Sequence, residues 1–223
     1  MTSRPRQQQR RRQEPVVVGV LGLQGDIEEH FSAVERALSR TGNGDGEAIL
    51  VKRLDDVKRI HALIIPGGES TVMGGLSSVK GILPALRERI TSNDNDALPI
   101  LGTCAGMIIL AKRAYDKVVG ETNQPLIGAL DITVERNSFG RQRESFEVEL
   151  KLDLPEGGGD KFHGVFIRAP SVKSVGQGVR ELARLGDSVV AVQQGRIIAT
   201  AFHPELSAST LLHEYLINLA ISS

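Results

Sequence analysis

Residues 99–112 read PILGTCAGMIILAK, and this stretch decides which fold the sequence indicates. A short apolar run leads into Gly-Thr-Cys-Ala-Gly at positions 102–106, and a second apolar run follows. The first run is typical of a buried strand and the second of a helix, so Cys104 is expected at a sharp strand-to-helix turn. Glycine suits both flanks of such a turn, because a Cβ there would collide with crowded backbone. The pattern predicts a nucleophile elbow with cysteine as the nucleophile.

Cys104 is the one cysteine of the chain. It forms no intramolecular disulfide, which suits a reducing, cytoplasmic compartment. An arbitrary lone cysteine is more often a buried, inert thiol than a reactive one. Its place at the start of a helix favours the reactive interpretation, because the helix dipole and free N–H groups stabilise a thiolate. The backbone N–H of Ala105 would then face a developing oxyanion.

The segments around the elbow indicate an α/β fold. Apolar runs at 16–21, 48–51, 62–65 and 99–102 predict strands that are covered on both faces. Ile27, Phe31, Val34 and Leu38 have helical spacing after the first run, and Asp26 with Glu29 occupies the positions of a capping box. Alternation of strands and helices predicts a mostly parallel, doubly wound central sheet with helices on both faces.

The second half of the chain has a different pattern. Residues 132–135, 145–150 and 164–167 alternate as antiparallel strands do. Two further strands, 188–193 and 196–202, flank a hairpin turn at Gln194-Gly195, and 209–217 closes the chain as a helix. Gly157–Gly159 is expected to be a surface loop.

A cysteine nucleophile needs a nearby base that takes up and returns protons. Of the five histidines, His203 has the sequence setting that best suits this role. It ends an apolar strand within Ala201-Phe202-His203-Pro204-Glu205, so it is expected at the sheet edge. Glu205, two residues later, can return to orient the imidazole. Three of the remaining histidines are interpreted as surface or capping residues: His30, His61 and His213. His163 precedes a predicted strand, and its role stays undecided.

A third segment, Pro66-Gly67-Gly68-Glu69-Ser70-Thr71, also follows an apolar strand. Paired glycines can turn backbone N–H groups toward a ligand, as an anion nest or half of an oxyanion hole, although an ordinary turn would use them too. Three such segments end three strands, and a doubly wound sheet gathers strand ends at one crevice. This convergence favours an active site.

Charge and length limit the remaining possibilities. The 223 residues carry no net charge and suit one large domain. Residues 1–14 hold five arginines and one acid, and are predicted to be a disordered basic extension, with a transit peptide or a nucleic-acid arm as alternatives. Residues 15–223 form the domain, which is mildly acidic and has no broad basic surface for nucleic acid. No apolar run is long enough to span a membrane.

Taken together, these segments resemble the class I (triad) glutamine amidotransferase family, and more closely the glutaminase subunits of pyridoxal 5′-phosphate synthases. The elbow and the His-Pro-Glu segment carry the resemblance to the family as a whole. The segments 134–142 and 165–170, each of which contains arginine, carry the closer resemblance to the glutaminase subunits. The matching segments are 19–25, 66–71, 102–106, 134–142, 165–170 and 202–206.

The resemblance implies a Cys-His-Glu triad: Cys104 is the nucleophile, His203 the general base and acid, and Glu205 the orienting carboxylate. Gly68 and Ala105 would supply oxyanion N–H groups. The implied glutamine-binding residues are Gly68, Glu69, Ser70, Arg136, Ile167 and Arg168. From the sequence alone, surface salt bridges are the simpler explanation of the two arginines.

The implied reaction is hydrolysis of L-glutamine to L-glutamate and ammonia through a thioester, with no metal and no cofactor. The ammonia would pass to a separate pyridoxal 5′-phosphate synthase subunit in a hetero-oligomeric complex, with no nucleic-acid or membrane partner. Segments that depart from the family pattern lie at 1–14, 41–46, 92–96 and 157–159.

Three alternatives remain. The chain could serve a different amidotransferase, or be an inactive regulatory subunit of the same fold. A dinucleotide-binding module on Gly19 to Gly25 is disfavoured, because Gly19-x-x-Gly22-x-x-Gly25 is not the G-x-G-x-x-G pattern.

Overall fold

A computed structural model describes residues 15–42, 45–91, 97–139, 145–155 and 157–222. The predicted basic extension at 1–14, the 92–96 segment and the end of the 134–142 segment lie outside these residues. Within them, no helix has the length and apolar character needed to cross a membrane.

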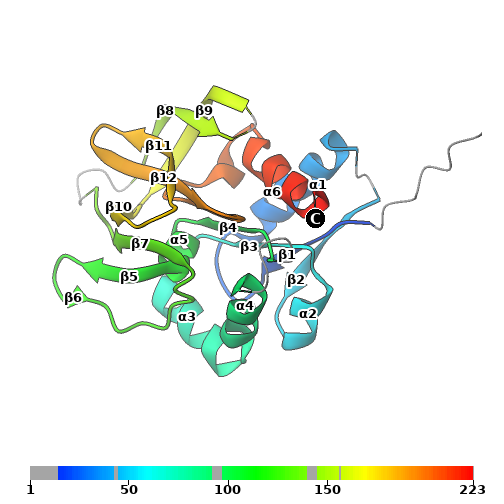
Figure 1. The fold of residues 1–223 in the computed structure, drawn as a ribbon, viewed down its shortest axis with the longest axis horizontal. Helices are drawn as coiled ribbons and strands as arrows, with labels where there is room; N and C mark the ends of the chain where they lie inside the picture. Colours follow the sequence, from blue (N-terminus) through cyan, green and yellow to red (C-terminus); the bar gives the residue numbers. More distant parts are fainter. Residues whose placement is uncertain (1–14, 43–44, 92–96, 140–144, 156, 223) are drawn as a thin grey trace, which may run out of the picture.

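The centre of the fold is one large mixed sheet, shown in Figure 1. Its parallel half runs in the order β2 (Glu47–Val51), β1 (Val17–Leu21), β3 (Ala62–Ile65), β4 (Ile100–Thr103) and β13 (Ile197–Thr200). Every residue of β3, β4 and β13 is buried. Continuous apolar runs form these strands because helices or strands cover both faces.

The other half of the sheet is mostly antiparallel. From β13 it continues through β12 (Ser188–Gln194), β10 (Ser171–Val175), β7 (Leu130–Glu135), β5 (Ala111–Asp116) and β6 (Gly120–Glu121), while β11 (Arg180–Leu185) pairs with β12. One parallel pair, β5 with β7, interrupts this pattern. The predicted hairpin about Gln194-Gly195 is present as β12–β13.

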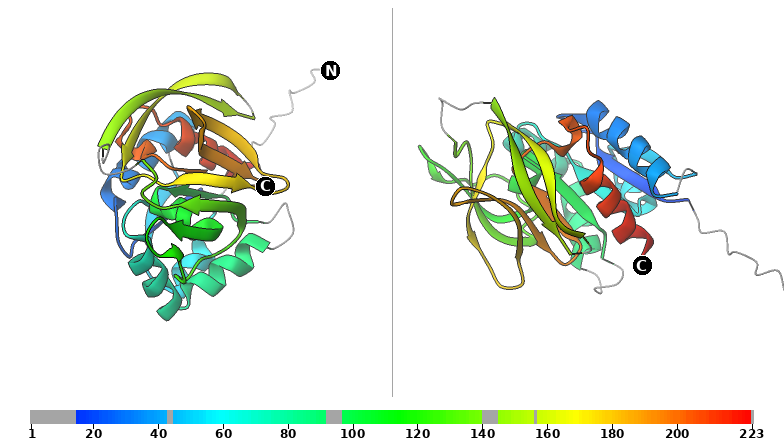
Figure 2. Two further views of the ribbon diagram at one scale, coloured as in Figure 1. Left: turned by 90° about the vertical axis from the view of Figure 1, so that its left-hand side faces the viewer. Right: turned by 90° about the horizontal axis from the view of Figure 1, so that it is seen from above.

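A separate two-stranded sheet consists of β8 (Ser145–Leu154) and β9 (Gly157–Ile167). Figures 1 and 2 place it at one end of the molecule, above the large sheet. The expected loop at Gly157–Gly159 is wrong, because these residues begin β9 and Gly157 pairs with Leu154. Backbone pairing with β8 overrides the weak strand preference of glycine here.

Helices cover both faces of the sheet (Figure 1). On one side, α1 (Ile27–Arg40) packs against α6 (Leu211–Ile221), and the opposite side carries α2 (Leu54–Arg59), α3 (Ser70–Val79) and α4 (Ile82–Thr91). The short α5 (Ala105–Leu110) follows β4 and passes directly into β5. The predicted α/β class, with a mostly parallel doubly wound core and added antiparallel strands, is confirmed.

Two neighbouring glycines of α3 provide a matched test of this packing. A Cβ on Gly74 would lie 2.5 Å from the carbonyl oxygen of Pro125, whereas a Cβ on Gly75 would meet nothing within 4 Å. We expect Gly74→Ala to lower the free energy of unfolding by about 1–3 kcal/mol through overpacking. We expect Gly75→Ala to raise it by about 0.5–1 kcal/mol, because alanine is the better helix former.

Urea unfolding of both variants beside the wild type measures the difference. Equal stabilisation by the two substitutions would contradict the close approach of the Pro125 backbone to α3.

Candidate active site

The predicted elbow is present at the junction of β4 and α5. Cys104 precedes α5 with φ 49° and ψ −100°, a left-handed backbone conformation that is rare for a residue with a side chain. A Cβ on Gly102 would lie 2.8 Å from the backbone carbonyl carbon of Gly106, and one on Gly106 would lie 2.1 Å from the carbonyl oxygen of Ile65. Both flanking positions therefore require glycine, for the reason that the sequence predicted.

Cys104 is held by the neighbouring strand. Its backbone N–H donates to the carbonyl oxygen of Thr200 at 2.8 Å, which ties the elbow to the end of β13. The residue is 8% exposed, and its Sγ lies 3.8 Å from the carbonyl oxygen of Ile167. Ala105 is the first residue of α5, where a backbone N–H has no partner within the helix. Its N–H is therefore available to a ligand beside the sulfur.

His203 and Glu205 lie next to each other below the sheet edge. Glu205 belongs to the short 3₁₀ helix η2 (Pro204–Leu206), and its Oε1 accepts from Nδ1 of His203 at 2.7 Å. Both residues are buried. The backbone N–H of His203 donates to the carbonyl oxygen of Val165 at 2.8 Å, so β9 helps to place the imidazole. The Nε2 atom of His203 makes no hydrogen bond to a described residue, which leaves it available for proton transfer.

Asp26 is a site residue that the sequence assigned to another role. The sequence predicted a capping box, and Asp26 does precede α1, but its side chain makes no capping hydrogen bond. Its Oδ2 instead lies 3.2 Å from Nδ1 of His203, the same nitrogen that Glu205 binds. Attraction to the imidazole outweighs the local gain of a cap. The hydrogen bond to His203 also lowers the pKa of Asp26.

These neighbours favour the charged form of His203. Burial opposes protonation, but Asp26, Cys104 and Glu205 together outweigh it and raise the pKa of His203 to about 12. An imidazolium at neutral pH is the partner that a thiolate needs. Burial raises the pKa of Glu205, and the charge of His203 acts in the opposite direction. The groups around His203 therefore hold it as an imidazolium.

One cavity of about 270 Å³ collects the predicted residues. Two of the three proposed triad members line it, and Glu205 lies behind His203. The lining includes all residues predicted to bind glutamine or an oxyanion: Gly68, Glu69, Ser70, Ala105, Arg136, Ile167 and Arg168. Gln24, Asp26, Ile108 and Asn137 also line it, and the sequence had not assigned them a role there.

A network of polar side chains holds Arg136 at this cavity. Its Nη2 lies 3.1 Å from Oε1 of Glu69, whose carboxylate also accepts from the first N–H groups of α3. Gln124, from the loop before β7, accepts from Ser70 and Thr71 at 3.3 Å and from Arg136 at 3.4 Å. The predicted surface salt bridge of Arg136 is real, but it orients the guanidinium over the cavity. Gln124 had no sequence signal, because only the fold brings its loop to α3.

Backbone strain marks the same cavity. Among the described residues, the non-glycine residues with positive φ are Cys104, Asn137 and Arg168, and all three line it. Each such conformation costs about 1–3 kcal/mol and persists only where surrounding structure enforces it. Strained residues cluster at functional sites, so the backbone indicates the cavity independently of side-chain chemistry.

Among the residues that the structure describes, one group of possible metal ligands has its atoms close enough together to hold an ion. It consists of Asp26, His203 and Glu205. Their closeness has a simpler cause, since both carboxylates hydrogen-bond to one imidazole nitrogen. A cation there would have to displace the proton on that nitrogen.

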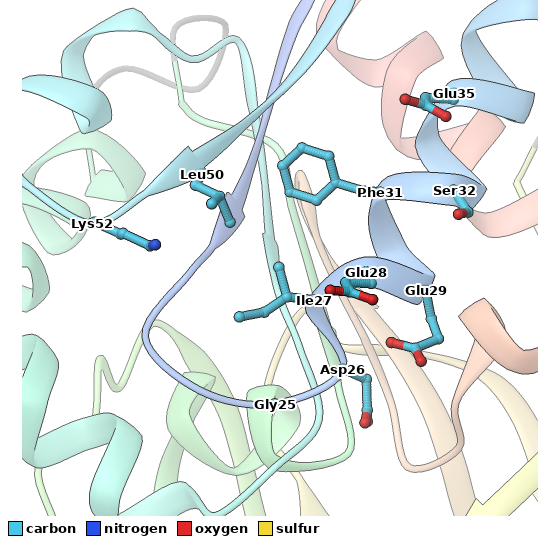
Figure 3. A pocket seen from close by; sticks show the side chains of 10 residues that line it. All are labelled: Gly25, Asp26, Ile27, Glu28, Glu29, Phe31, Ser32, Glu35, Leu50 and Lys52. Carbon is cyan, nitrogen blue, oxygen red and sulfur yellow. The ribbon is translucent and has the colours of Figure 1, made fainter.

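A second, more open hollow of about 730 Å³ lies beside the cavity, between α1 and β2. Figure 3 shows Ile27, Phe31 and Leu50 facing one another across it, with Glu28 and Glu29 near its edge. Asp26 lies on the wall of both hollows.

Two histidine assignments were wrong. His30 and His213 are fully buried, not surface or capping residues, and their imidazoles contact each other. His61 is exposed, and its Nδ1 accepts from the backbone N–H of Val17. The undecided His163 is also exposed and lies between Glu147 and Glu149. The long separations in sequence explain why His30 and His213 gave no signal.

Comparison with known proteins identifies the family of the chain. The model of the SNO glutamine amidotransferase family matches residues 20–222. A protein of Pyrobaculum neutrophilum named pyridoxal 5′-phosphate synthase subunit PdxT is 49% identical over 91% of this chain and 98% of its own length. A protein of the same name from Nitrosopumilus maritimus is 43% identical over 91% of this chain and 95% of its own length.

Solved structures give the same result. A crystal structure of a glutamine amidotransferase is 47% identical, covers 91% of this chain and 98% of its own, and superimposes with a TM-score of 0.77. A glutamine amidotransferase from Thermotoga maritima, 15% identical with a TM-score of 0.59, shares the fold. The chain belongs to the SNO glutamine amidotransferase family.

Proposed function

We propose that this chain is the glutaminase subunit of a pyridoxal 5′-phosphate synthase. The observation that carries the proposal is the line of three side chains at one cavity: Cys104 at the elbow, His203 beside it, and Glu205 at 2.7 Å from His203. Membership of the family supports the reaction, and the printed names of the relatives support the pathway.

In the first half of the reaction, the Cys104 thiolate attacks the side-chain amide carbon of glutamine. The amide oxygen becomes an oxyanion, and the backbone N–H groups of Gly68 and Ala105 are the proposed donors to it. Collapse of this intermediate breaks the carbon–nitrogen bond. Ammonia leaves with the proton that His203 held on Nε2, and a γ-glutamyl thioester remains on Cys104.

In the second half, His203 acts as the base. It takes a proton from water, and the resulting hydroxide adds to the thioester carbon. Collapse releases glutamate and returns the thiolate beside a protonated imidazole. Glu205 and Asp26 carry the negative charge that makes the imidazolium stable through this cycle.

The substrate-binding residues follow from the chemistry of glutamine, which offers an α-carboxylate and an ammonium. Arg136 and Arg168 suit the carboxylate, because a guanidinium pairs with it through two hydrogen bonds. The carboxylate of Glu69, although it caps α3, lies at the same wall and suits the ammonium. Gly68, Ser70 and Ile167 complete the proposed binding surface.

The proposed domain bounds, compartment, cofactor requirement and partners are those that the sequence predicted. The domain spans 15–223, works in the cytoplasm, needs no cofactor, and passes ammonia to a separate synthase subunit in a hetero-oligomer. Neither nucleic acid nor a membrane is a proposed partner. An amidotransferase for another acceptor is the main alternative, and an inactive regulatory subunit is the second; the intact set of Cys104, His203 and Glu205 favours an active enzyme.

Glutamate release from L-glutamine tests the proposal, with the chain alone and with a pyridoxal 5′-phosphate synthase subunit. We expect activity that rises with the synthase subunit and falls by about a thousandfold or more in Cys104→Ala, because the thioester cannot form. Ser39→Ala on the exposed side of α1 serves as a control. Glutaminase activity that does not change when the synthase subunit is added would contradict the proposed role in pyridoxal 5′-phosphate synthesis. Absence of glutaminase activity in a folded complex would contradict the proposal that the chain is an enzyme.

A second prediction concerns the two carboxylates on His203. Asp26→Asn removes one of them, so the pKa of His203 should fall and the imidazolium should be lost at lower pH. We expect the alkaline limb of kcat/KM, which requires the proton that His203 gives to ammonia, to move to lower pH, and kcat/KM at its maximum to fall by about 3–10-fold. Glu28→Gln, which removes a carboxylate from the same turn, should leave both unchanged. An unshifted limb in Asp26→Asn would show that Asp26 does not contribute to the charge of His203.

A further inference from the structure

A chain of buried polar side chains continues inward from Glu205. The Oε2 atom of Glu205, which faces away from His203, lies 3.3 Å from Nε2 of His30 on α1. The same Nε2 lies 3.2 Å from Oγ1 of Thr103, and Nδ1 of His30 lies 3.1 Å from Nε2 of His213 on α6. His30 is 0% exposed and His213 1% exposed. Two histidines thus stand behind the proposed triad.

Both histidines are neutral at neutral pH. Burial lowers the pKa of His30 well below its ordinary value, and electrostatic repulsion between His30 and the protonated forms of His213 and His203 acts in the same direction. Burial also lowers the pKa of His213 to about 3, with a further contribution from Arg36. Glu205 is the carboxylate that faces this pair.

Neutrality allows the protons to be assigned. A lone pair on Nε2 of His30 would face the Glu205 carboxylate at 3.3 Å and be repelled, so this nitrogen carries the hydrogen. Nδ1 of His30 must then accept, which requires His213 to donate from Nε2. Nδ1 of His213 is left without a hydrogen, and it makes no hydrogen bond to a described residue. This tautomer of each ring accounts for the contact between the two imidazoles, and it places the Nε2 hydrogen of His30 beside both Glu205 and Thr103.

The two histidines affect the active site through the contact between His30 and Glu205. Oε2 of Glu205 is buried and accepts no hydrogen bond of normal geometry from a described residue. Nε2 of His30 lies 3.3 Å from this oxygen and 3.2 Å from Oγ1 of Thr103, and it brings an N–H dipole close to the carboxylate. Burial of a carboxylate without such a dipole favours the protonated acid. A protonated Glu205 would no longer balance the imidazolium of His203.

We propose that His30 and His213 are positioning residues of the glutaminase site: His30 keeps Glu205 ionised and turned toward His203, and His213 fixes the tautomer of His30. This inference rests on the roles proposed above for Cys104, His203 and Glu205. The competing explanation is structural, because the same two rings join α1 to α6, as Arg40 does through Thr210 and Glu214.

Substitutions at His30 separate the two explanations. Glutamine places an N–H near the position of Nε2, asparagine is too short to do so, and leucine fills the space without a donor. The readouts are the rate of Cys104 alkylation by iodoacetamide against pH, the kcat and KM for glutamine in the complex with the synthase subunit, and urea unfolding. Unfolding data identify the pH range in which each variant is folded.

We expect the acid limb of alkylation to move to higher pH by about one unit in His30→Leu and His30→Asn, because Glu205 then takes up a proton more readily. In these variants kcat should fall by about 10–100-fold with KM within twofold of the wild type. His30→Gln should restore both the limb and kcat to within about threefold. His213→Leu should show a smaller shift in the same direction, and His213→Gln none.

Two results would overturn the inference. One is an unshifted alkylation limb in folded His30→Leu; the other is a His30→Gln variant that loses as much kcat as His30→Leu. A wild-type protein that hydrolyses no glutamine would refute the proposed function. Alkylation of Cys104 needs no glutamine, so its pH dependence in the variants would still test the roles of His30 and His213.

Acid unfolding checks the neutral state of His213. A folded pKa below the unfolded value near 6.5 gives stability that is present above pH 6.5 and is lost as the pH falls toward 3. His213→Gln should therefore reduce the proton uptake on unfolding at pH 4–5 by about one proton, obtained from the slope of the unfolding free energy against pH. An unchanged slope would mean that His213 is charged in the folded protein and would refute the tautomer assignment.

Discussion

The close packing of the elbow against β3 is the constraint on which the rest of the site depends. The backbone at Gly106 approaches the carbonyl oxygen of Ile65 so closely that no Cβ fits between them. This approach forces the turn at Cys104 and brings the end of β4 next to the loop that follows β3. With β13 paired to β4 on its other side, the sulfur, the Gly67-Gly68 loop and His203 meet at one sheet edge.

Electrostatics at that edge are organised around one buried imidazole. His203 has carboxylates from two distant segments on the same nitrogen, Asp26 from the start of α1 and Glu205 from η2. The partly exposed Asp26 is accessible from the second hollow, whereas Glu205 is enclosed. The two therefore differ in environment: Glu205 is buried and lies next to His30, whereas Asp26 is partly exposed to solvent.

Much of this could be predicted from short stretches of sequence. The parallel strands, the elbow glycines and the His-Pro-Glu segment are local patterns, and the structure places them as expected. Long-range features could not be predicted in this way. Asp26 looks like a helix cap in sequence, and its contact with His203 exists only because β1 and β13 end at the same edge. Gln124 and the buried pair of His30 and His213 depend in the same way on helices and loops that meet across the core.

The amino-acid sequence alone determined the fold class and the family, and it predicted Cys104 as the nucleophile, because apolar runs, turn glycines and motif spacings are encoded within a few consecutive residues. Tertiary structure alone decided that Asp26 joins Glu205 on His203, which loop holds Arg136, and which histidines lie behind Glu205. The physical reason is that burial and hydrogen-bond partners are properties of the packed chain. His30 and His213 are 183 positions apart, yet the packing of α1 on α6 brings their rings to 3.1 Å.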